Sequence, residues 1–282
     1  MDNTQLNITP EEFMVVCISR QIEDGELVAQ GLATPLVAAA YLLARHTHAP
    51  HLYFASAIGQ GVCRDPAPLS LTQIESLWLD RSITNIGFIR AVADVLPVLK
   101  AKEFFRPAQV DACGNFNNIA FGQDYRHPRL RLPGSGGIPD VTPILSDTCL
   151  YVPRHSKITF VEKLDFLSGM GFHPARTHGD GPRFLVTDLG QFDFANGRMR
   201  LVSHHPGVKV ERILSRTGFA LEISPNLYET HLPSDQEIRL LREEIDPLGI
   251  RNLESMSGAE RRDFLQTIIN HEARARPKLK AT

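Results

Sequence analysis

The stretch from Gln109 to Asp140 contains two short patterns that decide how the chain is interpreted. The first reads QVDACGNFN from Gln109 to Asn117, and the second reads PGSGG from Pro133 to Gly137. Gly and Asn tolerate a positive φ, so the first pattern predicts a strand that ends in a tight turn. The second has almost no Cβ atoms, so its backbone amides can approach a ligand such as a phosphate or a polarised thioester oxygen. Taken alone, the glycine run is also compatible with an ordinary loop.

Composition limits the classes of function that remain open. The chain has 282 residues, of which 43% are hydrophobic and 22% charged, as in ordinary soluble globular proteins. A formal net charge of -2 provides no basic surface for nucleic acid or an anionic membrane. No apolar run approaches the length of a membrane span, and the N-terminus lacks signal-peptide features. The four cysteines show no CxxC spacing, so no metal site is expected, and a cytoplasmic enzyme is the simplest interpretation.

Helix and strand signals alternate in the first half of the chain and give way to hairpin signals in the second. Capping boxes at Thr9 with Glu12 and at Ser234 with Glu237 predict two helix starts. Further helices are expected at 36–45, 71–79, 89–96, after Gly137, at 208–216 and in the tail. Strands are expected at 26–30, 52–57, 103–106, 118–121, 149–153, 159–164, 183–187, 191–194 and 198–203. The pattern predicts an α/β fold with an open, mostly parallel mixed sheet, flanking helices and C-terminal hairpins.

The two central patterns, in this order, resemble those of the B subunit of class I CoA-transferases of the glutaconate CoA-transferase type. The resemblance extends over most of the chain and includes ITPEE from Ile8, HAP from His48, VTDLG from Val186 and HPG from His205. It implies a CoA-transferase-like domain at 1–250, followed by a helical tail at 251–282. It also implies an A subunit as partner, an A2B2 heterotetramer, an acyl-CoA substrate and no separate cofactor.

The resemblance also identifies a missing nucleophile. In this family a glutamate at the end of a buried strand attacks the thioester and carries the acyl group and CoA in turn. Counting from Ala49-Pro50 places Ala57-Ile58-Gly59 on that motif, and no acidic residue occurs between His51 and Arg64. Alanine cannot form the covalent intermediate, so the chain resembles the two family members that also lack the glutamate. These are the myxobacterial glutaconyl-CoA decarboxylase and the ring-opening CoA hydrolase of steroid degradation.

Both of those reactions cleave a carbon–carbon bond and leave electron density on the thioester oxygen as an enolate. We expect the amides of Gly136 and Gly137 to stabilise that oxygen. Ser56, beside the lost nucleophile at Ala57, is a further candidate for contact with substrate. The remaining expected contacts with substrate or CoA are Gln109, Asn115, Gly134 and Ser135. A general acid or base is expected from the A subunit or from His51, His127 or His155.

Three other interpretations stay open at this point. The chain can be a true CoA-transferase subunit, or a non-catalytic scaffold that supports an active A subunit. A sugar-phosphate isomerase or sensor domain shares the broader fold, although the two central patterns belong to the CoA group. The sequence does not identify the acyl group, and it does not decide between decarboxylation, hydrolysis and transfer.

Overall fold

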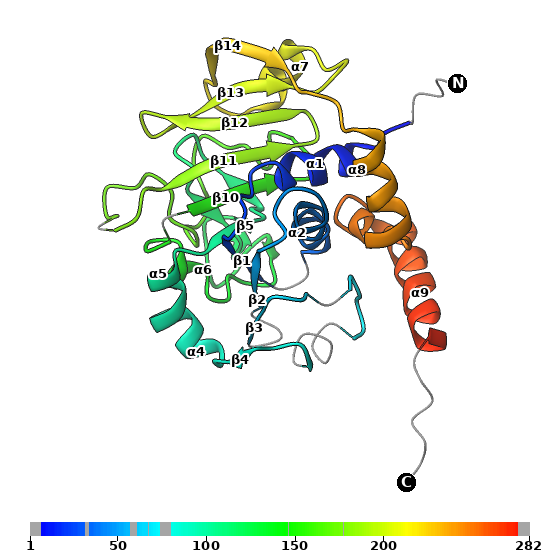
Figure 1. Ribbon diagram of the computed structural model, residues 1–282. Coiled ribbons are helices and arrows are strands. Elements are labelled where there is room, and N and C mark those ends of the chain that lie inside the picture. The colour runs from blue at the N-terminus through cyan, green and yellow to red at the C-terminus, as the bar shows by residue number, and fades with distance from the viewer. Residues whose placement is uncertain are drawn as a thin grey trace. The chain divides into compact units, whose positions relative to one another are not determined.

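The computed structural model describes residues 7–31, 34–56, 61–66, 68–73, 80–145, 147–176 and 178–275 (Figure 1). Contacts divide the chain into two compact units. Unit 1 comprises Met1–Gly25, Gln30–Asn85 and Ser234–Thr282, and unit 2 comprises Glu26–Ala29 and Ile86–Pro233. This division differs from the predicted one at residue 250, because the C-terminal helices belong with the N-terminal helices in unit 1.

Unit 1 is built around two helices whose starts are fixed by local sequence. Helix α1 begins after Thr9, whose hydroxyl accepts a hydrogen bond from the Glu12 amide, while the Glu12 carboxylate accepts one from the Thr9 amide. This confirms the first predicted capping box. Helix α2 is buried from Pro35 to Ala44 because its Ala- and Leu-rich sequence presents no polar face. The elements of unit 1 are α1 (Pro10–Ser19), α2 (Pro35–Thr47), β2 (Tyr53–Ser56), β3 (Gly61–Cys63), β4 (Thr84–Asn85), α8 (Asp235–Arg239), η2 (Leu240–Ile245), η3 (Ile250–Glu254) and α9 (Gly258–Ala275).

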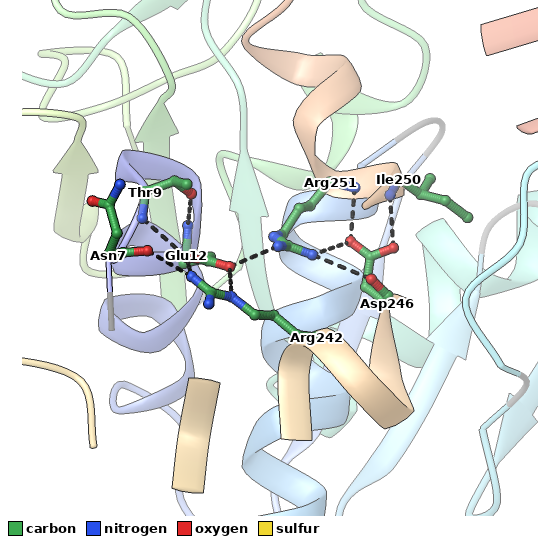
Figure 2. A network of polar contacts seen from close by, with 7 residues as sticks. All are labelled: Asn7, Thr9, Glu12, Arg242, Asp246, Ile250 and Arg251. Carbon is green, nitrogen blue, oxygen red and sulfur yellow. Dashed lines mark hydrogen bonds and ion pairs between the residues drawn. The ribbon is translucent and has the colours of Figure 1, made fainter. Parts of the chain in front are cut away.

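A buried polar network joins the first helix of unit 1 to the C-terminal helices (Figure 2). The Glu12 carboxylate accepts hydrogen bonds from Arg242 Nε at 2.6 Å and Arg251 Nη2 at 2.9 Å. The Asp246 carboxylate accepts bonds from the Ile250 amide, the Arg251 amide and Arg251 Nη1. Burial alone would raise the pKa of Glu12, but the hydrogen bond from Arg242 and the charge of Arg251 hold that pKa below its usual value. The network therefore holds together segments more than 200 residues apart.

The tail helix α9 also packs within unit 1. Ile268 forms a core cluster with Ile250 and Leu253, and Leu69 and Leu71 pack against it. The Glu272 carboxylate accepts hydrogen bonds from the amides of Leu71 and Thr72 at 2.9 and 2.8 Å. The predicted tail helix is confirmed, and the structure shows it as a packing element of unit 1.

Unit 2 is organised on a sheet with the strand order β14-β13-β12-β11-β10-β5-β1. Strands β1, β5, β10 and β11 pair in parallel, β11, β12 and β13 pair antiparallel, and β14 is parallel to β13 (Figure 1). The α/β class, the mostly parallel pairing and the predicted hairpins are thereby confirmed. The sheet strands are β1 (Leu27–Gln30), β5 (Lys102–Phe105), β10 (Asp147–Val152), β11 (Pro182–Thr187), β12 (Gly190–Ala195), β13 (Arg198–His204) and β14 (Glu222–Glu229).

The connections of unit 2 carry the remaining short elements. The helical segments are α4 (Phe88–Arg90), η1 (Ala91–Val95), α5 (Leu96–Leu99), α6 (Ile138–Val141) and α7 (Val210–Arg216). The short hairpins are β6 (Gln109–Val110) with β7 (Phe116–Asn117), and β8 (Ala120–Phe121) with β9 (Leu130–Arg131). Within the described residues, no helix combines the length and the apolar character that a membrane crossing requires.

Two strand predictions differ from the structure, and one strand was not predicted. Segment 159–164 forms only an isolated bridge at Phe160, because the amides of Thr159 and Phe160 both donate to the Ser156 carbonyl in a turn. Within the strand predicted at 118–121, only Ala120 and Phe121 form a strand, β8, which pairs with β9. The sequence does not predict strand β14, because its mostly exposed residues lack an apolar alternation. Most of the helix predicted at 71–79 lies outside the described residues.

Candidate functional site

The QVDACGNFN pattern folds into a turn that Asp111 closes. Its carboxylate accepts hydrogen bonds from the amides of Cys113 at 2.9 Å and Asn115 at 3.0 Å, and from Asn115 Nδ2 at 3.0 Å. Gly114 has a φ of +71°, and a Cβ at this position would lie 2.5 Å from Pro182 and 2.8 Å from Phe194. Only glycine fits this turn, since any side chain would be both strained and in collision. The predicted strand-to-turn structure is confirmed.

The PGSGG pattern forms an open loop just before α6. Gly134 and Gly136 have φ values of +107° and +52°, and an added Cβ at either would meet nothing within 4 Å. Among the described residues, the backbone amides of 134–137 have no hydrogen-bond acceptor. The Ser135 carbonyl accepts a bond from the Ile138 amide at 3.0 Å, which fixes where the loop enters α6. The loop thus presents successive unpaired donors on a backbone free of side-chain bulk.

The segment 168–176 links the turn to the glycine loop. Its Gly171 amide donates to Asn115 Oδ1 at 2.8 Å, and the Met170 amide donates to Thr142 Oγ1 at 2.9 Å. A Cβ on Gly169 would lie 2.1 Å from the Phe116 ring, and one on Gly171 would lie 2.3 Å from the Cys113 carbonyl. The two glycines therefore let this segment lie directly against the turn.

Arg176 completes this link. Its Nε donates to the Gly171 carbonyl at 2.8 Å, and its two Nη atoms donate to carbonyls at Thr142, Pro143, Met170 and His178. Burial lowers the pKa of Arg176, partly offset by Asp180. The guanidinium fork thus holds the end of α6, which follows the glycine loop, against the segment that contacts Asn115.

Gln109 and Asn115 are both buried, and their side-chain amides form hydrogen bonds with other groups of the protein. Gln109 Oε1 accepts from Asn117 Nδ2 at 2.8 Å and from the Asp165 amide at 3.1 Å, and its Nε2 donates to Asp165 Oδ2 at 3.2 Å. These bonds make the two side chains supports of the site wall. Direct contact of either with CoA stays a prediction, as do the contacts of Gly134 and Ser135.

Comparison with known proteins places the chain in a family. It is 30% identical over 266 residues to the B subunit of glutaconate CoA-transferase from Acidaminococcus fermentans, covering 86% of this chain and 94% of that one. The chain belongs to the CoA-transferase B subunits. It is also 30% identical over 263 residues to the cholesterol ring-cleaving hydrolase IpdB subunit of Rhodococcus jostii, covering 90% and 99% of the two chains. No protein-family model matches the chain.

Solved structures agree with this assignment. The decarboxylase AibA/AibB superposes with a TM-score of 0.75 at 33% identity, over 87% of this chain and 98% of that one. The glutaconate CoA-transferase of Acidaminococcus fermentans gives a TM-score of 0.74 at 27% identity, over 86% and 96% of the chains. The family therefore includes transferases, a decarboxylase and a hydrolase, and the AibA/AibB and Rhodococcus jostii IpdAB complexes each pair an A with a B subunit.

Ala57, which the sequence predicts at the position of the nucleophile, lies outside the described residues, as does the rest of 57–60. Its neighbour Ser56 ends β2 in unit 1, where it is buried and paired with Gly61 of β3. The loop 134–137, Gln109 and Asn115 all belong to unit 2, whereas Ser56 belongs to unit 1.

The three histidines considered as acid or base differ in environment. His155 Nε2 lies 3.0 Å from Thr217 Oγ1, Nδ1 lies 3.3 Å from Thr187 Oγ1, and the ring stacks on Phe160 at 3.8 Å. Burial, with the nearby charge of Arg216, lowers the pKa of His155 to about 3, so the ring is neutral at physiological pH. His51 and His127 are exposed and lie 2.8 and 3.0 Å from Asp24 and Asp124.

The segments VTDLG and HPG meet at Thr187, and the first of them also contacts His155. The His155 amide donates to Asp188 Oδ1 at 2.7 Å, and His205 Nε2 lies 2.9 Å from the Thr187 carbonyl. Burial lowers the pKa of His205 to about 4. VTDLG and HPG therefore build a polar core in this chain, with each ring nitrogen of His155 and His205 satisfied by the protein.

Glu103 is a titratable group that the sequence patterns do not single out. It lies on β5 between Ala29 of β1 and Thr148 of β10, and only 9% of the residue is exposed. Burial raises the pKa of Glu103 to about 7, and no hydrogen bond or charge in the described structure offsets that. The neighbouring Thr148 Oγ1 is buried with no partner among the described residues. The sequence feature that could have pointed to Glu103 is an acidic residue inside the short strand KEFF.

Nowhere in the described chain do three His, Cys, Asp or Glu side chains gather to hold a metal ion.

Proposed function

We propose that this protein forms, with an A subunit, an enzyme that cleaves a carbon–carbon bond of a CoA thioester without a glutamyl intermediate. The reaction class is decarboxylation or hydrolytic ring opening. Support comes from relatives named as a decarboxylase and as a cholesterol ring-cleaving hydrolase. The A subunit, an A2B2 assembly in the cytoplasm, and the absence of any cofactor besides the CoA thioester substrate are parts of the same proposal.

The observation that carries the proposal is the row of unpaired amides at 134–137. Cleavage of the carbon–carbon bond leaves an enolate, whose negative charge is concentrated on the thioester oxygen. Amides held at fixed positions stabilise this charge more than that of the neutral thioester, which lowers the barrier. Gly136 and Gly137 donate to the oxygen in our proposal, and Gly134 and Ser135 contact the adjoining part of the substrate.

Loss of the glutamate separates this chemistry from transfer. A transferase needs a carboxylate that accepts the acyl group and then CoA, and Ala57 provides none. Since His155 is neutral and enclosed, the proton is more easily supplied or removed by a group of the A subunit. The alternative is a true CoA-transferase, favoured by the glutaconate and 3-oxoadipate CoA-transferase relatives at 30% identity.

One experiment separates these functions. The complex with its A subunit is incubated with glutaconyl-CoA and labelled acetate, and all CoA species are followed by mass spectrometry. Release of carbon dioxide without labelled acetyl-CoA supports decarboxylation, whereas labelled acetyl-CoA overturns our proposal. If neither forms, cyclic acyl-CoA substrates are tested for ring opening, and failure with all of them leaves a scaffold role.

A matched pair of variants tests the role of position 57. Ala57→Glu restores the carboxylate and is expected to give measurable acetyl-CoA, whereas Ala57→Gln has nearly the same size and cannot carry an acyl group. Equal behaviour of the two variants would contradict the assignment of Ala57 to the nucleophile position.

A further inference from the structure

The segment immediately before the glycine loop is a hairpin rich in arginine. Strands β8 and β9 pair Ala120 with Arg131 and Phe121 with Leu130, and residues 122–129 connect them. The segment 122–133 contains Arg126, Arg129 and Arg131 against a single acidic residue, Asp124. We define residues 120–133 as the arginine hairpin. Its excess of positive charge contrasts with the formal net charge of -2 for the whole chain.

No carboxylate neutralises these arginines in the described structure. The Asp124 carboxylate is instead bonded to the Arg126 amide at 2.8 Å and lies 3.0 Å from His127 Nδ1. The contact with His127 holds the pKa of Asp124 below its usual value. All three arginines are exposed, and none of them forms an ion pair within the described part of the chain. Their guanidinium groups are therefore open to an anionic ligand.

Aromatic rings hold two of the guanidinium groups in place. Arg131 lies 4.4 Å from the centroid of the Tyr125 ring and donates to the Tyr125 carbonyl at 2.6 Å. Arg129 lies 5.9 Å from the centroid of Phe121. A guanidinium over a ring keeps most of its N–H donors directed away from the ring, and less side-chain freedom is lost when a phosphate binds.

The hairpin is anchored to the first of the two central patterns. The Gly122 amide donates to Asp165 Oδ2 at 2.9 Å, and that same oxygen accepts from Gln109 Nε2. Asn117 Nδ2 donates to the Ala120 carbonyl at 2.8 Å. At about 3.5 Å per residue, the Cα atoms of Arg131 and Gly134 are separated by at most about 11 Å. Arg131 therefore lies near the glycine loop, on a hairpin that the side chains of the site wall anchor.

We propose that the arginine hairpin binds the phosphates of the CoA nucleotide, that is, the pyrophosphate and the 3′-phosphate of its adenosine. This inference rests on the proposed function, because it assumes that the thioester lies at the glycine loop. The pantetheine arm separates the thioester from the phosphates, so a site for each is needed at different points along one surface. Arg129 and Arg131 provide planar, charge-assisted donors for phosphate oxygens, and Arg126 adds to the positive charge.

The test measures binding of three probes to the assembled complex by calorimetry: CoA, dephospho-CoA and pantetheine. The double variant Arg129→Gln with Arg131→Gln is expected to weaken CoA binding by about 100-fold, since loss of each charged contact costs about ten-fold. Binding of pantetheine is expected to be unchanged, because it carries no phosphate. Arg131→Lys keeps the charge but loses the planar guanidinium group, so its affinity for CoA is expected to lie between those of the wild type and the double variant.

The control is Arg212→Gln, which removes an exposed arginine from α7 and is expected to leave all three affinities unchanged. Unchanged CoA binding in the double variant would overturn the hairpin assignment while leaving the proposed function intact. Failure of the wild-type complex to bind CoA would overturn the proposed function as well. Loss of assembly with the A subunit in the double variant would mean that the hairpin binds an acidic protein surface, which also overturns the inference.

Discussion

The Glu12 network and the glycine loop differ in whether their polar groups have hydrogen-bond partners within the protein. In the Glu12 network, carboxylates and guanidinium groups bond to one another, and Arg251 Nε is the one buried polar atom of the network without a partner in the described structure. In the glycine loop, four successive residues present amides with no acceptor among the described residues. A satisfied buried network contributes to stability, whereas unpaired exposed donors contribute nothing until a ligand arrives. Substitutions in the Glu12 network should therefore lower stability, whereas substitutions in the glycine loop should lower turnover.

The largest expected loss of stability follows from Glu12→Gln. Glu12 and Arg251 have side chains only 2% and 6% exposed. Removing the Glu12 carboxylate leaves buried Arg251 with Asp246 as its one carboxylate partner, and leaves Arg242 with no ion-pair partner in the described structure. Breaking such a pair costs about 3–5 kcal/mol, which corresponds to a fall in melting temperature of about 10 °C. The pKa of Glu12 is held below its usual value, so its stabilisation is present at neutral pH and disappears as the pH falls through the folded-state pKa.

Thermal unfolding of the complex at pH 7 and at pH 4 measures both effects. The control is Asp94→Asn, which breaks the exposed pair with Arg90 at 3.6 Å and is expected to change stability by less than about 1 kcal/mol. Equal shifts for the two variants would show that the network is no more stabilising than a surface ion pair.

The next effect is on turnover, from Gly136→Ala. The φ of +52° at Gly136 disfavours alanine by about 1–2 kcal/mol, so the loop is expected to shift and to move its amides away from the thioester oxygen. Loss of one such donor lowers kcat by about 10²- to 10³-fold. Gly87→Ala is the matched control, because Gly87 has a φ of +65° and equally open space around a Cβ. Similar turnover in both variants would remove the loop from the mechanism.

Glu103 provides a test with the opposite dependence on pH. Burial raises the pKa of Glu103 to about 7, so its cost is absent below about pH 4.5, grows between pH 4.5 and 7, and is fully present above about pH 7. A rise in pKa from 4.5 to about 7 corresponds to about 3 kcal/mol, so Glu103→Gln should stabilise the complex at pH 8 and change little at pH 5. Melting temperatures at the two pH values measure this. A variant less stable at pH 8 than the wild type would mean that a partner stabilises the charged carboxylate.

Local rules explain how much of this structure can be predicted from the sequence. The capping boxes at Thr9 and Ser234 involve residues three apart, so the pattern predicts them and the structure confirms both. The turn at 109–117 follows from Gly and Asn in the same way. The partners of Glu12 cannot be predicted, because Arg242 and Arg251 come from the other end of the chain and no local pattern connects them.

The site itself is only partly accessible to sequence reasoning. Sequence patterns identify the glycine loop and the turn, but they give no sign that the segment 168–176 joins them. Its function as a link depends on the close approach of Gly169 and Gly171 to the turn, which exists only in three dimensions. The arginine hairpin gives no signal either, because three arginines in a loop resemble any solvated surface. They become notable only in the structure, where aromatic rings lie against two of them and Asp165 connects the hairpin to Gln109.

Substitution of Arg176 gives the smallest expected change in stability. It also tests the comparison between the Glu12 network and the glycine loop most sharply, because Arg176 is a structural residue that supports the loop. Arg176→Lys keeps a charge but cannot reach the carbonyls of Gly171, Thr142 and Met170 together, so we expect a loss of about 2 kcal/mol. Since α6 follows the loop directly, its displacement should lower kcat well beyond what the loss of folded protein explains. The readout is kcat at a temperature where the variant is fully folded, alongside KM for the acyl-CoA. If kcat is unchanged there, the loop holds its amides without the link at 168–176. A fall in kcat would show instead that structural and functional polar groups are coupled through one guanidinium group.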